Sequence, residues 1–84
     1  MKAKIIIVGQ PQSRSIIANA LRGGNDVERK EVCNTYMYKY RTKEDARAAL
    51  RVAWSELKED AGTLDGCDIR RGVLVYDAGR AVIE

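Results

Sequence analysis

The sequence predicts an α+β protein, a two-layer sandwich in which two helices cover one face of an antiparallel sheet. A short β-branched run at residues 5–8 and a longer strand-like stretch at 27–41 are the first observation. Between residues 43 and 61, apolar side chains recur with the period of a helix. The chain closes with two short apolar runs, between 73 and 83, separated by a turn.

Length and composition predict one small soluble domain that spans residues 1–84. The chain has 84 residues, of which 45% are hydrophobic and 32% charged. Fifteen Lys and Arg against 12 Asp and Glu give a formal charge of +3, a weaker excess than dedicated nucleic-acid binders show. The chain has no histidine, which excludes a histidine general base and histidine metal ligands.

The start of the chain and its thiols predict a cytoplasmic protein. The apolar run at 5–8 is shorter than the roughly 7–15 apolar residues of a signal peptide, and no run approaches the roughly 20 of a membrane span. Cys33 and Cys67 lie far apart, so we expect reduced, structural thiols and neither a metal nor another cofactor.

Residues 3–24 predict a strand followed by a helix. The run at 3–8 predicts a central strand buried on both faces. Ser13 is the predicted N-cap of a helix with one apolar face. Gly23 and Gly24 are where we expect that helix to end.

Residues 27–41 are longer than an ordinary strand. A break at 33–35 favours a hairpin of 27–32 and 35–41, and one long bent strand is the alternative. Tyr36, Tyr38 and Tyr40 alternate and therefore share a face. Because the chain has no phenylalanine, we expect these rings to fill the core; a platform for stacked bases is the alternative.

The long helix is predicted over residues 43–61, with Thr42 as its N-cap and Asp45 at the capping-box position. Its core face shows helical spacing and consists of Ala46, Leu50, Ala53, Trp54, Leu57 and Ala61. Gly62 should end the helix, and residues 63–68 should form a loop. The final hairpin should turn over residues 77–79 with Gly79 in the left-handed conformation.

The resulting order is β-α-β-β-α-β plus a C-terminal hairpin strand, which predicts a ferredoxin-like arrangement. Residues 5–9, and residues 36–40 leading into 42–46, resemble the first strand and the third strand of RNA-recognition motif domains. Ile6 stands where that family has an aromatic residue, and the Gly-Phe pair of its longer motif is absent before Tyr38. The resemblance therefore implies a shared topology rather than membership.

One face of the long helix carries a predicted basic band. Its members are the helix cations Lys43, Arg47, Arg51 and Lys58, with Arg70 and Arg71 after the helix. The alternative interpretation is an ordinary solvated helix surface. A second candidate is the junction at 9–15, where a helix start and Arg14 could hold a phosphate. This junction matches no known phosphate-loop pattern, which favours a plain connecting loop.

These observations predict a small non-enzymatic binding module whose partner is another protein. A weak nucleic-acid binder that uses the basic band is the alternative, and a small enzyme that uses Cys67 or loop carboxylates is a third class. Salt separates the first two, because phosphate contacts release counterions and make affinity fall steeply with ionic strength. No membrane partner is expected, and the sequence leaves the oligomeric state open.

Overall fold

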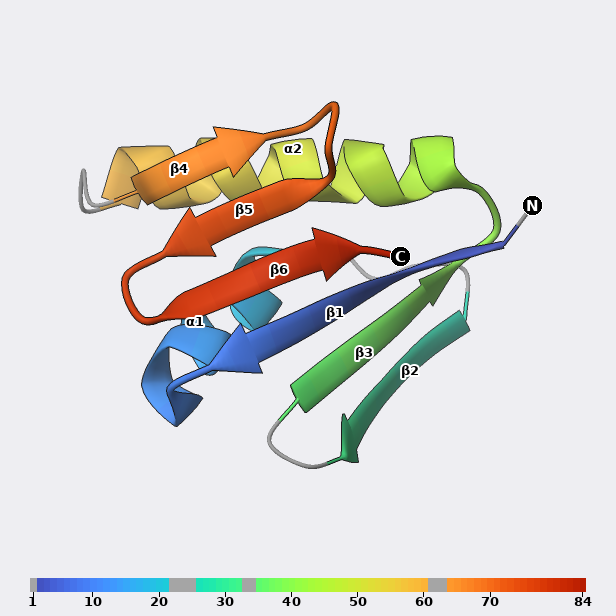
Figure 1. Ribbon diagram of the computed structural model, residues 1–84, viewed down its shortest axis with the longest axis horizontal. Coiled ribbons are helices and arrows are strands. Elements are labelled where there is room, and N and C mark those ends of the chain that lie inside the picture. The colour runs from blue at the N-terminus through green and yellow to red at the C-terminus, as the bar shows by residue number, and fades with distance from the viewer. Residues whose placement is uncertain (1, 22–25, 33–34, 61–63) are drawn as a thin grey trace.

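The computed structural model describes residues 2–21, 26–32, 35–60 and 64–84. Those residues form two helices and six strands (Figure 1). In chain order the elements are β1 (Ala3–Gly9), α1 (Pro11–Ala20), β2 (Asp26–Val32), β3 (Thr35–Tyr40), α2 (Lys43–Asp60), β4 (Leu64–Asp68), β5 (Val73–Tyr76) and β6 (Gly79–Ile83). Within the described ranges, neither helix is long and apolar enough to cross a membrane.

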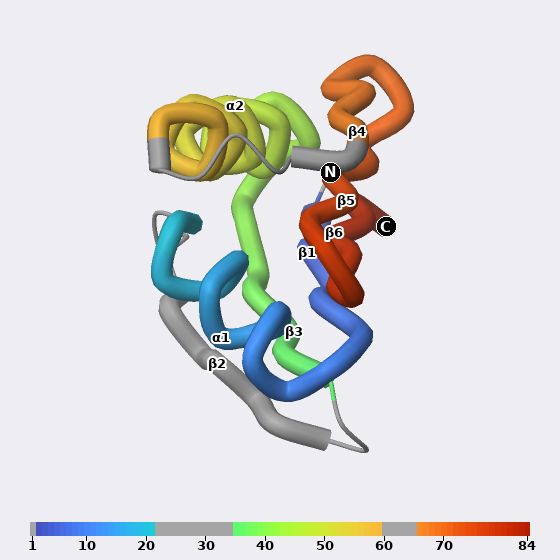
Figure 2. The backbone as a smooth tube through the Cα atoms, turned by 90° about the vertical axis from the view of Figure 1, so that its left-hand side faces the viewer, coloured from blue at the N-terminus to red at the C-terminus, as the bar shows by residue number. Residues whose placement is uncertain are grey.

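The strands form one sheet in the order β2-β3-β1-β6-β5-β4, and every neighbouring pair is antiparallel. Both helices lie on the same side of this sheet (Figure 2). The α+β class is therefore confirmed, and the preferred hairpin over residues 27–41 is confirmed as β2 and β3. Within the part of the chain that the structure describes, the other face of the sheet carries no helix (Figure 2).

The strand count differs from the prediction because residues 64–68, expected to be a loop, form β4. This segment is rich in Asp and Gly, which sequence patterns associate with turns. Its backbone nevertheless pairs with β5, with a register shift between Leu64 and Gly66. An edge strand needs hydrogen bonds to only one neighbour, so its side chains need not show the alternation of a buried strand.

Helix α1 begins at Pro11, two residues before the predicted cap at Ser13. Proline is well suited to the first helical position, because its fixed φ is helical and its missing N–H would have had no acceptor there. Gln10 is the N-cap residue and makes no side-chain capping bond. Ser13 is instead buried in the first turn, where its hydroxyl donates to Asp77 Oδ2 at 3.3 Å.

Helix α2 starts as predicted: the Asp45 N–H donates to Thr42 Oγ1 at 3.1 Å. The predicted core positions Ala46, Leu50, Ala53 and Leu57 are buried. Trp54, also expected in the core, is 36% exposed, so that part of the prediction is wrong. Its ring lies at the margin of the apolar face, where the Lys58 ammonium is 5.4 Å from the ring centroid.

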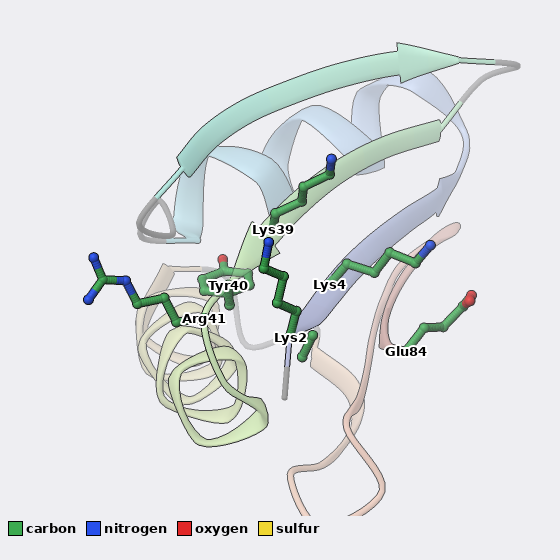
Figure 3. Close-up of a pocket in the computed structure, with 7 residues that line it drawn as sticks. Lys2, Lys4, Lys39, Tyr40, Arg41 and Glu84 are labelled. Atoms are coloured by element: carbon green, nitrogen blue, oxygen red, sulfur yellow. The ribbon is translucent and has the colours of Figure 1, made fainter.

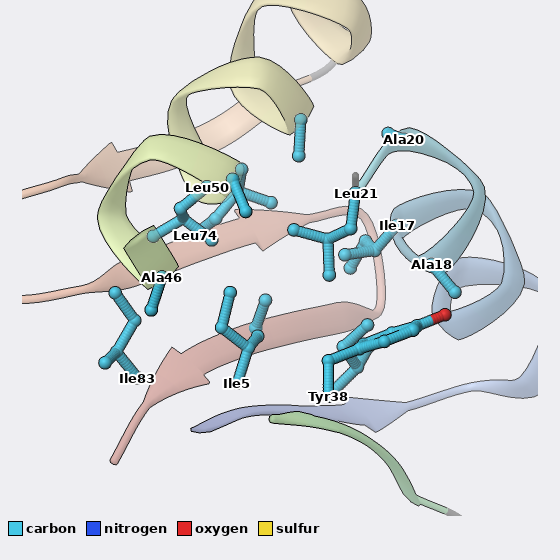
Figure 4. Close-up of a cluster of buried hydrophobic side chains, with 14 of the residues drawn as sticks. Ile5, Ile17, Ala18, Ala20, Leu21, Tyr38, Ala46, Leu50, Leu74 and Ile83 are labelled. Carbon is cyan, nitrogen blue, oxygen red and sulfur yellow. The ribbon is translucent and has the colours of Figure 1, made fainter. Parts of the chain in front are cut away.

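The core lies between the sheet and the two helices (Figure 4). Strand β1 contributes Ile5 and Ile7, both fully buried, while Ile6 and Val8 on its other face are half-buried. The expectation that β1 is buried on both faces is therefore wrong, because helices cover only one. Tyr36, Tyr38 and Tyr40 are buried, as the core interpretation predicted.

The β5–β6 turn differs from the predicted three-residue connection. Tyr76 and Gly79 pair in register, so two residues connect the strands, and Asp77 rather than Gly79 has a positive φ, of 49°. Gly79 is needed for space: a Cβ there would lie 2.8 Å from Ser13 Cβ. Predictions for Gly23, Gly24, Cys33, Ala61 and Gly62 fall outside the described residues.

Candidate binding site on the sheet

The helix-free face of the sheet is built by the alternate residues of its strands. Successive side chains of a strand point to opposite faces, so the residues between the buried ones project away from the helices. On β1 these are Lys4, Ile6 and Val8, and on β3 they include Met37 and Lys39. The face therefore combines cations with apolar side chains.

Three lysines gather at one end of this face. Lys4 on β1 and Lys39 on β3 are directly opposite in register, and Lys2 lies two residues before Lys4. We call Lys2, Lys4 and Lys39 the lysine cluster; their side chains stand on the same side of the sheet (Figure 3). They border a cavity of ≈ 310 Å³ whose lining is Lys2, Ala3, Lys4, Lys39, Tyr40, Arg41 and Glu84.

The charges in this cavity are unbalanced. Among the residues that line it, Glu84 is the acidic member against three lysines and an arginine. Figure 3 shows the Arg41 side chain directed away from the lysine cluster. Like charges directly opposite on neighbouring strands destabilise the pairing, by up to about 1 kcal/mol. A bound anionic group would relieve the repulsion between Lys4 and Lys39.

A row of apolar residues runs beside the lysine cluster. Ile6 pairs in register with Met37 on one side and Val82 on the other, and Val82 pairs with Val73. We call Met37, Ile6, Val82 and Val73 the apolar row. All four side chains are half-buried although no described helix covers them. Because they pair in register, they form a continuous apolar strip across four strands of the open face.

Tyr40 lies beneath the lysine cluster, on the helix side of β3, and is only 4% exposed. Burial and, to a smaller extent, the neighbouring Tyr38 together raise the pKa of Tyr40 to about 12. Both effects favour the neutral phenol. At neutral pH Tyr40 therefore adds no negative charge to offset the lysines.

The shifted pKa of Tyr40 predicts a loss of stability in strong alkali. The pKa of Tyr40 in the folded protein lies above its ordinary value of 10.0. The protonated phenol therefore contributes its full stabilisation below pH 10.0, and this stabilisation is lost as the pH rises to about 12. Denaturant unfolding across this interval should show a shallower fall in the free energy of unfolding for Tyr40→Phe than for the unmodified protein. Equal slopes would show that Tyr40 titrates normally.

The four helix cations of the predicted basic band lie along the length of α2 and differ in exposure and in their contacts. Lys43, Arg51 and Lys58 are exposed, whereas Arg47 is half-buried and donates from Nη1 to Glu44 Oε1 at 2.9 Å. Lys58 lies over Trp54. Two of the four helix cations thus have a partner on their own helix.

Arg70 and Arg71 belong to the turn between β4 and β5, in the sheet layer rather than the helix layer (Figure 2). Arg71 donates its backbone N–H to Asp68 Oδ1 at 3.2 Å, and its side chain lies 3.7 Å from Asp68 Oδ2. Both side chains of this ion pair are largely exposed, so it contributes little to stability.

Cys67 is on β4, half-buried, and packs against the core. Burial raises the pKa of its thiol, and the adjacent Asp68 carboxylate raises it further. Both effects reduce the thiolate fraction that a nucleophilic or metal-binding cysteine needs. Among the described residues, no group of Cys, Asp and Glu could hold a metal ion.

The lysine cluster was not predicted from the sequence. The signal that could have found the cluster is the alternation itself, which places Lys4 and Lys39 on the face opposite to the buried residues. Their meeting depends on the pairing of β1 with β3.

Comparison with known proteins returned no match: no family model, no curated protein and no solved structure matches this chain.

Proposed function

We propose that this protein is a small non-enzymatic binding module that binds an acidic protein surface on the helix-free face of its sheet. The register of Lys4 opposite Lys39, with the apolar row beside them, carries this proposal. The lysine cluster supplies positive charge that complements carboxylates and guides the approach of the partner. The apolar row supplies surface whose removal from water stabilises the complex.

The position of the aromatic rings supports a protein partner over a nucleic acid. Single-stranded nucleic acids bind to platforms on which bases stack on exposed aromatic rings. All four tyrosines, Tyr36, Tyr38, Tyr40 and Tyr76, are buried on the helix side. Trp54 is more exposed but belongs to α2, which lies in the helix layer and not on the open face of the sheet.

We further propose that the strands β2-β3-β1-β6 form a ferredoxin-like core to which β5 and β4 are added at one edge. Two features support this assignment: β3 lies antiparallel between β1 and β2, and the helices follow β1 and β3. An experimental structure that pairs β6 elsewhere than with β1 would contradict it.

Charge reversal at Lys4 and Lys39 should weaken binding of an acidic peptide by about tenfold or more, which corresponds to about 1.4 kcal/mol. The probe is a fluorescent peptide that alternates Glu with Val, and the measurement is anisotropy against protein concentration. The double variant Lys4→Glu/Lys39→Glu again places like charges opposite each other, so its fold should match that of the parent by circular dichroism.

The matched control is Arg47→Glu/Arg51→Glu, which changes the net charge equally but acts on the predicted basic band of α2. It should alter peptide binding far less than the sheet variant. The sheet proposal is wrong if the helix variant alone weakens binding. A single-stranded oligonucleotide that binds more tightly than the peptide, with a steep fall in affinity as salt rises, would favour the nucleic-acid alternative.

A further inference from the structure

The open face of the sheet carries a further cation at the end opposite to the lysine cluster. Arg80 of β6 is exposed and lies in register with Val8 of β1 and with Val75 of β5. These three residues help to line a cavity of ≈ 300 Å³ beside the β5–β6 turn. Asp77, which also lines this cavity, is engaged with Ser13 of α1, whose hydroxyl donates to it. The open face is therefore positive at both ends.

Half-buried apolar side chains lie between these two ends, namely the apolar row together with Val8 and Val75. Lys4 and Val8 are four residues apart on β1, so the two ends are separated by roughly 13 Å along the strands. The apolar row crosses three strand spacings, which is roughly 14 Å in the other direction. An α-helix is about 10 Å wide with its side chains, and about nine of its residues span 13 Å. The strip therefore has room for a helix laid along the strands (Figure 1).

The charge of the open face opposes its burial against a second copy of the chain. Among the described residues of this face, the lysine cluster and Arg80 are positive and Glu84 is negative. Asp68, at the margin, lies 3.7 Å from the Arg71 side chain, so this pair adds no net charge. Two such faces packed together would bring like charges into one interface, which costs free energy. An acidic occupant is complementary to the face instead.

An occupant of this face must also satisfy its own backbone hydrogen bonds. The central strands already pair with neighbours on both sides, so their N–H and C=O groups are not available to a segment that lies on the face. A single extended segment would lose water from its peptide groups without replacement, whereas a helix satisfies these groups internally. A helix packed on a sheet is also the arrangement that α1 and α2 adopt on the other face (Figure 2).

We propose that the partner presents an acidic amphipathic helix, which lies along the strands of the open face. This inference rests on the proposed function and specifies its partner. The apolar side of the helix covers the apolar row with Val8 and Val75, and its carboxylates contact the lysine cluster at one end and Arg80 at the other. Arg80 is then a specificity-determining residue, because it selects helices whose acidic groups lie about nine residues apart.

The test compares two labelled peptides of about 18 residues with identical Glu, Leu and Ala content, long enough for about five helical turns. One places its leucines at helical spacing, and the other spreads its apolar residues to every second position. By anisotropy, we expect the first to bind at least about tenfold more tightly, because only it presents a continuous apolar side as a helix. Circular dichroism of the mixture should exceed the sum of its components in helical signal, since isolated helices of this length are marginal in water.

Arg80→Glu should weaken binding of the helical peptide several-fold, and Arg80→Gln should weaken it less in the same direction. Both changes are at an exposed position, so the fold should match that of the parent by circular dichroism. The matched control is Arg51→Glu, an equal change of charge at an exposed position of α2, which should leave the dissociation constant nearly unchanged.

Three results would overturn the partner assignment while leaving the proposed function in place: equal or tighter binding of the alternating peptide, no gain of helical signal, or an Arg80→Glu variant that binds like the parent. A dimer in sedimentation equilibrium that the helical peptide dissociates would also overturn it, by assigning the face to a second copy. If Lys4→Glu/Lys39→Glu changed the binding of neither peptide, the proposed function itself would be wrong.

Discussion

Replacing Leu50 by alanine should lower the free energy of unfolding by about 2–5 kcal/mol. Leu50 is fully buried on the core face of α2, and Figure 4 shows it beside Leu74 of β5. Truncation removes apolar contact on both sides and leaves a cavity that the sheet and helix can only partly close. For a chain of 84 residues, this loss is a large share of the total free energy of unfolding that a protein of this size has.

Urea unfolding followed by circular dichroism measures this effect through the midpoint and slope of the transition. The matched control is Arg51→Ala, one residue further along the same helix and exposed, which should change stability by no more than about 0.5 kcal/mol. If both variants unfolded at the same urea concentration as the parent, the apolar face of α2 would be assigned wrongly.

Gly9→Ala should destabilise the protein by at least about 2 kcal/mol. Gly9 has a φ of +123°, a conformation that side chains rarely adopt. An added Cβ would also lie 2.2 Å from the Ala78 carbonyl oxygen, a backbone atom that accepts a 3.0 Å hydrogen bond from the Gln10 N–H. To make room, the β5–β6 turn would have to move and lose that bond.

Gly66→Ala is the control for Gly9→Ala, since a Cβ at Gly66 meets no atom within 4 Å. Its free energy of unfolding, measured by thermal unfolding, should lie within about 0.5 kcal/mol of that of the parent. A Gly9→Ala variant as stable as Gly66→Ala would mean that the contact between the end of β1 and the β5–β6 turn is looser than described.

The elements that could be predicted from the sequence are those with strong local signals. Helix α2 combines a capping threonine with apolar residues at helical spacing, and both features act within a few turns of the same segment. The hairpin of β2 and β3 was likewise favoured by a local signal, the turn-forming residues at 33–35 between two strand-like stretches. Strand β4 was missed since its only evidence is a backbone pairing with β5, which leaves little pattern in its side chains.

The candidate site on the sheet depended on longer-range information than the predicted basic band. The predicted basic band on α2 uses residues one or two turns apart, which helical periodicity can bring together. The lysine cluster joins Lys4 to Lys39, 35 residues later, through the register of β1 with β3. A shift of one residue in that register would send one of the two lysines to the other face.

The sequence by itself determined the α+β class, the cap and most of the core face of α2, and the shared face of the three tyrosines on β3. Each follows from periodicity or capping, which depend on neighbours in the chain. Only the tertiary structure decided which face of the sheet stays open, that Lys4 lies opposite Lys39, that the tyrosines of β3 face the helices, and that Arg14 is buried. These depend on strand register and on packing between distant segments, because burial and charge proximity are properties of the folded arrangement and not of any local stretch of chain.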